Sequence, residues 1–220
     1  MKSGLLISFL ALSTLSSFAQ GTINFNNRAV GSVVTRVYEG GTAMRVGNGT
    51  DDTPSGTMDW TSFTPLTGSN WMVSIRAAVG ANQPESSLTF GINPTTTTFR
   101  MGRNAGGFAG GSDGFVIATL SEIPFDTPVA TIEVFAWDRV AGGNDPATAF
   151  ALWKGSAIEG GVSGAFNLND LGGAINIPPN LVGLQSFNVW LIPEPGTLAF
   201  LGLSTALLVR RTLHSKSRNR

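Results

Sequence analysis

The side chains that could do chemistry in this chain of 220 residues are mainly carboxylates, arginines and tryptophans. The chain has no Cys, and its one His is His214, close to the C-terminus. Disulfides, thiolate metal sites and Cys nucleophiles are therefore excluded. A Ser-His-Asp triad, a His general base and a His-rich zinc site are likewise excluded from the central part of the chain.

Pairs of carboxylates are the first alternative, because two of them facing one cleft could hydrolyse a glycosidic bond. The candidates Asp113, Glu133 and Asp138 are scattered along the chain. Their spacing does not set the separation of about 5 or about 9 Å that the two hydrolytic mechanisms need. Glu133 shares one face of a predicted strand with Phe135 and Trp137, and we expect this face to be exposed. A glycoside hydrolase is therefore the least favoured hypothesis, and we predict that the protein is not an enzyme.

Acidic loops offer a second alternative, a structural calcium ion, which needs about six to eight oxygen ligands. Suitable residues occur in segment 48–52, in Asp59 and in segment 138–145. Neither segment matches the EF-hand or the glycine-rich nonapeptide pattern, and Asp and Asn also favour turns by bonding to their own backbone. The glycine-rich stretch 102–114 lacks the Gly-Lys-Ser/Thr of a phosphate-binding loop. We expect no cofactor, and structural calcium stays an open alternative.

Tryptophan rings could bind a sugar by stacking on it, and the chain has five tryptophans. Core packing is the commoner use of this side chain, whereas exposed aromatic patches mark binding sites. Trp60 and Trp137 are the candidates for stacking on a ligand. A carbohydrate-binding module is therefore the main alternative function, and it requires an exposed aromatic face.

Short alternating segments, separated by Gly and Pro, must position these side chains. Segment 71–79 is the clearest strand, with Val73, Ile75 and Ala77 on one face. Similar segments lie at 22–26, 30–38, 95–100, 115–120, 129–138, 162–168 and 184–192. Seven or eight short strands with frequent turns predict an all-β fold, specifically an antiparallel, jelly-roll-like β-sandwich. We expect one such domain over residues 20–192.

One segment, 147–154, has the spacing of a short helix. Asp145 and Pro146 favour a helix start, because Asp caps the first turn and Pro is tolerated in it. Gly155 would end the helix. The sequence therefore predicts a single short helix among the strands.

The N-terminus has the three parts of a secretory signal peptide. Lys2 supplies a positive charge, segment 5–15 is apolar, and small residues precede a predicted cut between Ala19 and Gln20. We therefore expect residues 1–19 to direct export and to be removed.

Residues 193–220 combine a rigid turn, an apolar segment and a basic tail. The motif Pro193-Glu194-Pro195 ends the last predicted strand, because its prolines fix φ and lack backbone donors. Residues 197–209 are apolar and lie at the short end of what spans about 30 Å of hydrocarbon. Arg210-Arg211 follow and would stay cytoplasmic by the positive-inside bias. We therefore expect a single membrane helix over residues 197–209.

This combination resembles the PEP-CTERM sorting signal of proteins secreted by Gram-negative bacteria. The matching parts are the recognition motif at Pro193, Glu194 and Pro195, the membrane segment 197–209, and the basic stop at Arg210 and Arg211. The resemblance implies that an exosortase, a membrane-embedded processing enzyme, recognises the motif and cuts there. It further implies release or transfer to the cell surface and an association with exopolysaccharide and biofilm.

The charges are unevenly distributed, although the formal net charge is zero. Segment 20–195 holds eight of the 14 Lys and Arg and all 14 Asp and Glu, so its formal charge is −6. This argues against nucleic acid as a partner, because nucleic acid needs a basic footprint. We predict an exported, non-enzymatic protein of the cell surface or extracellular matrix, anchored in the membrane as a precursor.

Overall fold

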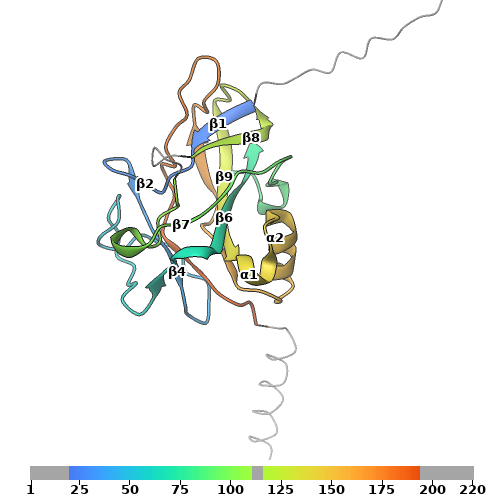
Figure 1. Cartoon of the computed structure of the whole chain (residues 1–220). Helices are drawn as coiled ribbons and strands as arrows, with labels where there is room; N and C mark the ends of the chain where they lie inside the picture. The colour runs from blue at the N-terminus through green and yellow to red at the C-terminus, as the bar shows by residue number, and fades with distance from the viewer. Residues whose placement is uncertain (1–19, 111–115, 194–220) are drawn as a thin grey trace, which may run out of the picture.

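The computed structural model describes residues 20–110 and 116–193, and their regular structure is mostly β (Figure 1). The strands are β1 (Gln20–Asn24), β2 (Arg28–Ala29), β3 (Val33–Val34), β4 (Val37–Glu39), β5 (Thr64–Pro65), β6 (Gly68–Val79), β7 (Thr96–Phe99), β8 (Ile117–Pro124), β9 (Val129–Asp138), β10 (Gly160–Val162), β11 (Phe166–Asn169) and β12 (Phe187–Val189). The α-helices are α1 (Arg139–Gly142) and α2 (Pro146–Lys154), and the 3-10 helices are η1 (Glu85–Ser87) and η2 (Gly102–Asn104). These elements confirm the prediction of an all-β class.

The longest strands, β6 and β9, form the centre of the main sheet. They pair antiparallel from Trp71 opposite Asp138 to Val79 opposite Ala130. The strand order is β10-β9-β6-β7, and β11 also pairs with β9. The smaller sheets are β1-β8, β2-β3 and β12-β4-β5, and β12 runs parallel to β4. This parallel pair brings the last described strand beside one of the first.

One face of the β6–β9 pair packs into the larger hydrophobic core. Val73 and Ile75 of β6 and Val134 of β9 alternate along their strands and are buried there with side chains of the smaller sheets, among them Phe187. Alternate residues of a strand point to the same face. The predicted alternation of both strands is therefore confirmed.

The opposite face of the same strands is also buried, because α2 covers it (Figure 1). Phe135 and Trp137 of β9 lie in a second hydrophobic cluster with Ala149 and Trp153 of α2. Glu133, on the same face, has an exposed fraction of only 3%. The prediction that this face is exposed is therefore wrong, because the strand pattern does not reveal which helix will cover it.

Helix α2 confirms the predicted start and end signals. The Asp145 side chain accepts a hydrogen bond from the Thr148 backbone N–H at 2.8 Å, Pro146 is the first helical residue, and Gly155 follows the last. The short helix α1 was not expected. It is capped by Asp138, whose carboxylate accepts hydrogen bonds from the next turn of backbone.

Three predicted strands are shorter in the structure than their alternation indicates. Segment 30–38 contains β3 and β4 as separate strands, segment 162–168 is split between β10 and β11, and segment 184–192 contains only β12. Gly164 has a φ of 73° and interrupts the second of these. Such left-handed backbone ends a strand and suits Gly, which has no Cβ. Alternating apolar residues in irregular segments therefore made these strands look longer in the sequence than they are in the structure.

The two ends of the described chain lie far apart in Figure 1: β1, which begins it, lies in the upper part of the view, and the segment that ends it lies at the bottom. Among the described residues, no helix is long and apolar enough to cross a membrane. The predicted membrane helix at 197–209 lies outside them.

Candidate functional site

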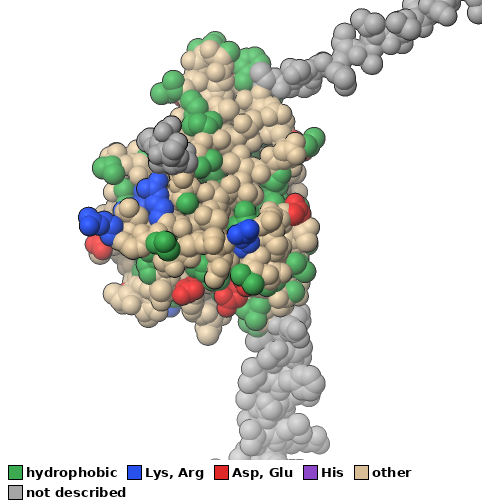
Figure 2. Space-filling model, viewed as in Figure 1, with side chains coloured by type: hydrophobic (Ala, Val, Ile, Leu, Met, Phe, Trp, Pro, Cys, Tyr) green, Lys and Arg blue, Asp and Glu red, His purple; other side chains and the backbone are tan. Residues whose placement is uncertain are grey.

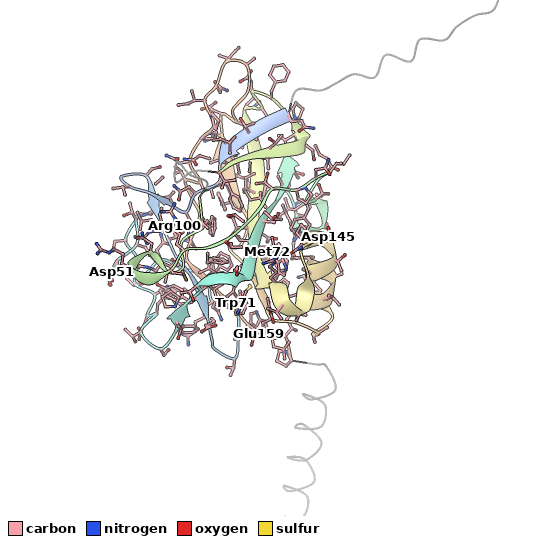
Figure 3. The ribbon with its side chains drawn as sticks, in the orientation of Figure 1. Asp51, Trp71, Met72, Arg100, Asp145 and Glu159 are labelled. Carbon is pink, nitrogen blue, oxygen red and sulfur yellow. The ribbon has the colours of Figure 1, made fainter. Side chains whose placement is uncertain are left out.

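The described surface has a hollow of about 450 Å³ between β4 and the loop that follows it. Arg36 and Tyr38 line one side, and residues 49–52 and 57–61 line the other. Asp51 marks the position of the hollow in Figure 3, at the left of the view. We call this feature the Arg36–Asp52 hollow.

The Asp52 carboxylate is the most unusual group in the hollow. Its side chain has an exposed fraction of 1%. Oδ2 accepts hydrogen bonds from the Gly49 backbone N–H at 2.7 Å and from the Ser186 hydroxyl at 2.8 Å. Oδ1 accepts no hydrogen bond within the described part of the chain. Because a buried acceptor without a partner costs free energy, this oxygen calls for an explanation.

The loop around Asp52 is closed by its own backbone and attached to the sheet. Gly56 N–H donates to the Gly49 carbonyl at 2.9 Å. Only Gly fits at position 56, because a Cβ there would lie 2.1 Å from the Asn48 carbonyl oxygen. Ser186, which precedes β12, joins the loop to the β12-β4-β5 sheet through its bond to Asp52. The buried carboxylate is therefore held in a fixed position.

Arg36 supplies the positive charge of the hollow. Its Nη1 lies 4.0 Å from Asp52 Oδ1, which is the outer limit of an ion pair and too long for a hydrogen bond. The Arg36 side chain is 22% exposed. A hydrogen-bond donor and an unpartnered acceptor therefore lie close together in the wall of one hollow.

Tyr38 and Trp60 form an aromatic wall. Their rings stack with centroids 4.5 Å apart and planes 7° from parallel, and Phe63 meets Trp60 edge-on at 5.1 Å. The Trp60 indole N–H donates to the Gly47 carbonyl at 3.0 Å. Burial, with the charge of Asp52, raises the pKa of the Tyr38 hydroxyl above its ordinary value. The hydroxyl is therefore neutral at physiological pH.

The rim of the hollow is acidic. Asp51 and Asp59 line it, and both are exposed. The Asp59 carboxylate accepts hydrogen bonds from the backbone N–H and hydroxyl of Thr61, at 2.9 and 2.7 Å, and these bonds lower its pKa. With Asp52, three carboxylates and the Arg36 guanidinium line the same hollow.

The carboxylates considered for glycoside hydrolysis have other roles where they are described. Glu133 Oε2 accepts a hydrogen bond from Arg76 Nη1 at 2.7 Å, beneath α2. Burial raises the pKa of Glu133, with Arg76 acting in the opposite direction. Asp138 caps α1, and Asp113 lies outside the described residues. The structure therefore does not bring Glu133 and Asp138 together at an accessible cleft.

The two predicted calcium loops also use their oxygens internally. Asn48 Oδ1 accepts a hydrogen bond from Ser186 N–H, and Asp138 and Asp145 cap the two helices. Figure 3 places Asp51 and Asp145 on opposite sides of the molecule, so the loops do not combine. Within residues 20–110 and 116–193, no group of three or more acidic, His or Cys side chains could hold a metal ion.

Neither proposed stacking tryptophan presents a free ring face. Trp137 has an exposed fraction of 0%, and its indole N–H donates to the Gly143 carbonyl at 2.9 Å, so the prediction that Trp137 stacks on a ligand is wrong. Its partner in the core is Phe135, stacked at 5.2 Å. Trp60 is also buried, but it belongs to the wall of the Arg36–Asp52 hollow.

Of the residues at the two predicted processing sites, the structure describes only Gln20 and Pro193. Gln20 is exposed and begins β1, and Pro193 is exposed after β12. The other predicted residues, which lie outside the described ranges, are Ala19, Glu194, Pro195, Arg210 and Arg211. Export, processing and anchoring therefore stay predictions.

Sequence reasoning missed the pairing of Arg36 with Asp52. The available signal was Arg36 and Tyr38 two residues apart in a β-branched stretch, which puts both side chains on one face of an extended chain. The contribution of Ser186, which lies 134 residues from Asp52, had no local signal.

Comparisons with known proteins give no assignment for the site. No protein-family model matches the chain, and neither the curated proteins nor the solved structures include a match. The function must therefore be inferred from the described residues and the predicted sorting signals.

Proposed function

We propose that this protein is an exported component of the cell surface or extracellular matrix, sorted by an exosortase at Pro193-Glu194-Pro195. The observation that carries the proposal is where the described strands lie along the chain. The first described strand, β1, begins at Gln20, next to the predicted signal cleavage site, and the last, β12, ends at Val189, shortly before the motif.

The chain is held close to the motif and then leaves the fold. Trp190 and Gly160 exchange backbone hydrogen bonds at 2.9 and 3.2 Å. Leu191 and Pro193 beyond them are exposed. Such an exit supports access of a membrane processing enzyme to the motif. In Figure 1 β1 lies far from this exit, so the body would extend away from a membrane that lies at the motif.

The proposed role is non-enzymatic and associated with exopolysaccharide or biofilm. The finer fold that we propose for this role is the jelly-roll-like β-sandwich. Figure 2 shows few charged side chains over the face that it presents, in keeping with a chain of only 13% charged residues. A surface with few charges suits a hydrated matrix, and the formal charge of −6 over segment 20–195 argues against nucleic acid as a partner.

The test is the mass of the intact product recovered from native cells and from the medium. Wild-type protein should begin at Gln20 and end near Pro195. Combined replacement of Pro193→Ala, Glu194→Ala and Pro195→Ala should leave a membrane-bound precursor that retains Arg220. The control, Arg210→Lys with Arg211→Lys, keeps the basic stop and should be processed normally.

Two results would refute the sorting proposal. Normal release of the triple-alanine protein would show that the motif is not recognised. A wild-type product that retains Arg220 would show a plain membrane anchor.

A carbohydrate-binding module is the second candidate, and the Arg36–Asp52 hollow is the observation that favours it. The hollow combines a donor and an acceptor in one place beside the rings of Tyr38 and Trp60, although these rings are largely buried and do not supply the exposed aromatic face expected from the sequence. Trp137 plays no part in this candidate function, since it is fully buried.

A further inference from the structure

We infer that the Arg36–Asp52 hollow binds a neutral sugar ring through neighbouring hydroxyl groups. In this site Asp52 Oδ1 accepts a hydrogen bond from one hydroxyl, and the Arg36 guanidinium donates to the oxygen of another. The inference extends the second candidate function to named residues and a ligand class. It does not depend on the sorting proposal, because the hollow is formed entirely within the folded body.

The first observation is the unpartnered oxygen. Asp52 Oδ2 is fully engaged by Gly49 and Ser186, whereas Oδ1 accepts no hydrogen bond from any described residue. Buried polar atoms without partners are rare in folded proteins and often have a functional cause. A ligand hydroxyl would satisfy this atom.

The second observation is the mixture of charges. An anion would meet the carboxylates of Asp51, Asp52 and Asp59, and a cation could reach the Asp52 carboxylate only beside the Arg36 guanidinium, which lies 4.0 Å from it. A hydroxyl group both donates and accepts hydrogen bonds. Neighbouring hydroxyls of a neutral sugar therefore match a donor and an acceptor in the same wall.

The third observation is the size and lining of the hollow. Its volume of about 450 Å³ lies within the usual range for small-ligand sites. Met58, which is only partly buried, gives the hollow an apolar side against which the C–H groups of a sugar ring can pack, whereas Tyr38 and Trp60 are stacked on each other and expose little of their rings. Polar and apolar surfaces are thus both present.

Access to Asp52 requires movement of Arg36. The Asp52 side chain is almost fully covered, but the guanidinium lies 4.0 Å from it and donates no hydrogen bond to Oδ1. Turning toward a ligand oxygen would therefore break no hydrogen bond between Arg36 and Asp52, but it would change the contact of Arg36 with the Tyr38 side chain. The first hydroxyl then reaches Oδ1.

The experiment is saturation-transfer difference NMR on the full chain, in a detergent without a sugar head group. The probes are the neutral methyl glycosides of glucose, galactose, mannose and N-acetylglucosamine. Methyl glucuronide and glucosamine serve as the anionic and cationic comparisons. We expect transfer to at least one neutral glycoside and weaker transfer to both charged compounds.

Three variants locate the binding site. Asp52→Asn keeps an oxygen for Gly49 and Ser186 and places an amide N–H₂ where Oδ1 stood, so it should weaken binding at least about tenfold. Arg36→Gln should have a similar effect. Asp170→Asn makes the same chemical change at an exposed position outside the hollow and should leave binding unchanged.

Four results would overturn the inference. These are no transfer to any neutral glycoside, preference for a charged one, equal binding by Asp52→Asn and wild type, and loss of binding in Asp170→Asn. A melting midpoint within about 3 °C of wild type shows that Asp52→Asn is folded. If that variant unfolds, Arg36→Gln decides the question alone.

Discussion

Two buried carboxylates of this protein each lie beside an arginine, and they differ in how completely they are partnered. Glu133 accepts a hydrogen bond from Arg76 at 2.7 Å in the main sheet. Asp52 Oδ1 is 4.0 Å from Arg36 and accepts none from the described residues. One carboxylate lies beneath a helix, and the other lies in the wall of an open hollow.

The Glu133 network is closed by neighbouring groups. Arg76 Nη2 donates to the carbonyls of Glu85 and Leu88 at 2.8 and 3.0 Å. The guanidinium also lies 4.1 Å from the ring centroid of Phe150 on α2. This network connects strand, turn and helix, and it accounts for the burial of Arg76 without any ligand.

The comparison shows that burial of a charge does not by itself indicate a binding site. Glu133 is buried and has a raised pKa, yet its contacts are structural. Asp52 differs in two respects: one of its oxygens has no hydrogen-bond partner within residues 20–110 and 116–193, and it lies at a hollow. Only the second carboxylate has reason to bind a ligand.

The largest expected effect on stability comes from breaking the Arg76–Glu133 ion pair. Arg76→Met should lower the free energy of unfolding by about 3–5 kcal/mol, because it leaves Glu133 buried without its cation. Urea titration followed by tryptophan fluorescence measures the change. Adding Glu133→Leu to the same chain should restore much of the loss, since two apolar side chains need no ion pair. A cost below about 1 kcal/mol for Arg76→Met would contradict a structural role.

The next effect is the pH dependence of stability. Burial raises the pKa of Glu133 above its ordinary value of 4.5, so the folded state binds this proton more tightly than the unfolded state does. The contribution of Glu133 to stability is then fully present below pH 4.5 and is lost as the pH rises through the folded-state pKa.

Glu133→Gln isolates this contribution, because Gln does not titrate. The variant should lose the decline in unfolding free energy that the wild type shows above pH 4.5. Urea titrations of both proteins over the weakly acidic range provide the measurement. An equal decline in the two proteins would assign it to other groups.

The smallest effect on stability is expected at the Arg36–Asp52 pair. Asp52→Asn should change the free energy of unfolding by less than about 1 kcal/mol, because its amide oxygen can accept both bonds that Oδ2 accepts. The same urea titration is the measurement, with Arg76→Met as the contrasting variant. A loss above about 2 kcal/mol would make Asp52 a structural residue like Glu133.

Local patterns predicted much of the fold. The alternation in β6 and β9 and the signals around Asp145 and Gly155 depend on neighbours within a few residues, and the structure has them where predicted. Strand lengths were overestimated at segments 30–38 and 184–192. In these segments apolar loop residues happen to alternate with polar ones. A strand has the same alternation because successive side chains point to opposite faces, so the two cannot be told apart from the sequence.

The candidate site was predicted only in fragments. Trp60 and the acidic segment 48–52 were singled out, but for stacking and for calcium. Their actual arrangement depends on Ser186 and Arg36, which reach Asp52 through the parallel pairing of β4 and β12. Contacts between distant segments leave no periodic signal in a single sequence.

The sequence by itself determined the β-rich class, the start and end of α2 and the absence of Cys and of His from the central chain, because each depends on residue type or local spacing. Only the tertiary structure decided which charges are buried and which partners they have. Glu133 is covered because α2 packs over its strand, and one Asp52 oxygen has no hydrogen-bond donor among the described residues because Arg36 stays 4.0 Å away. Hydrogen bonding and desolvation act over a few ångströms in space, whatever the separation along the chain.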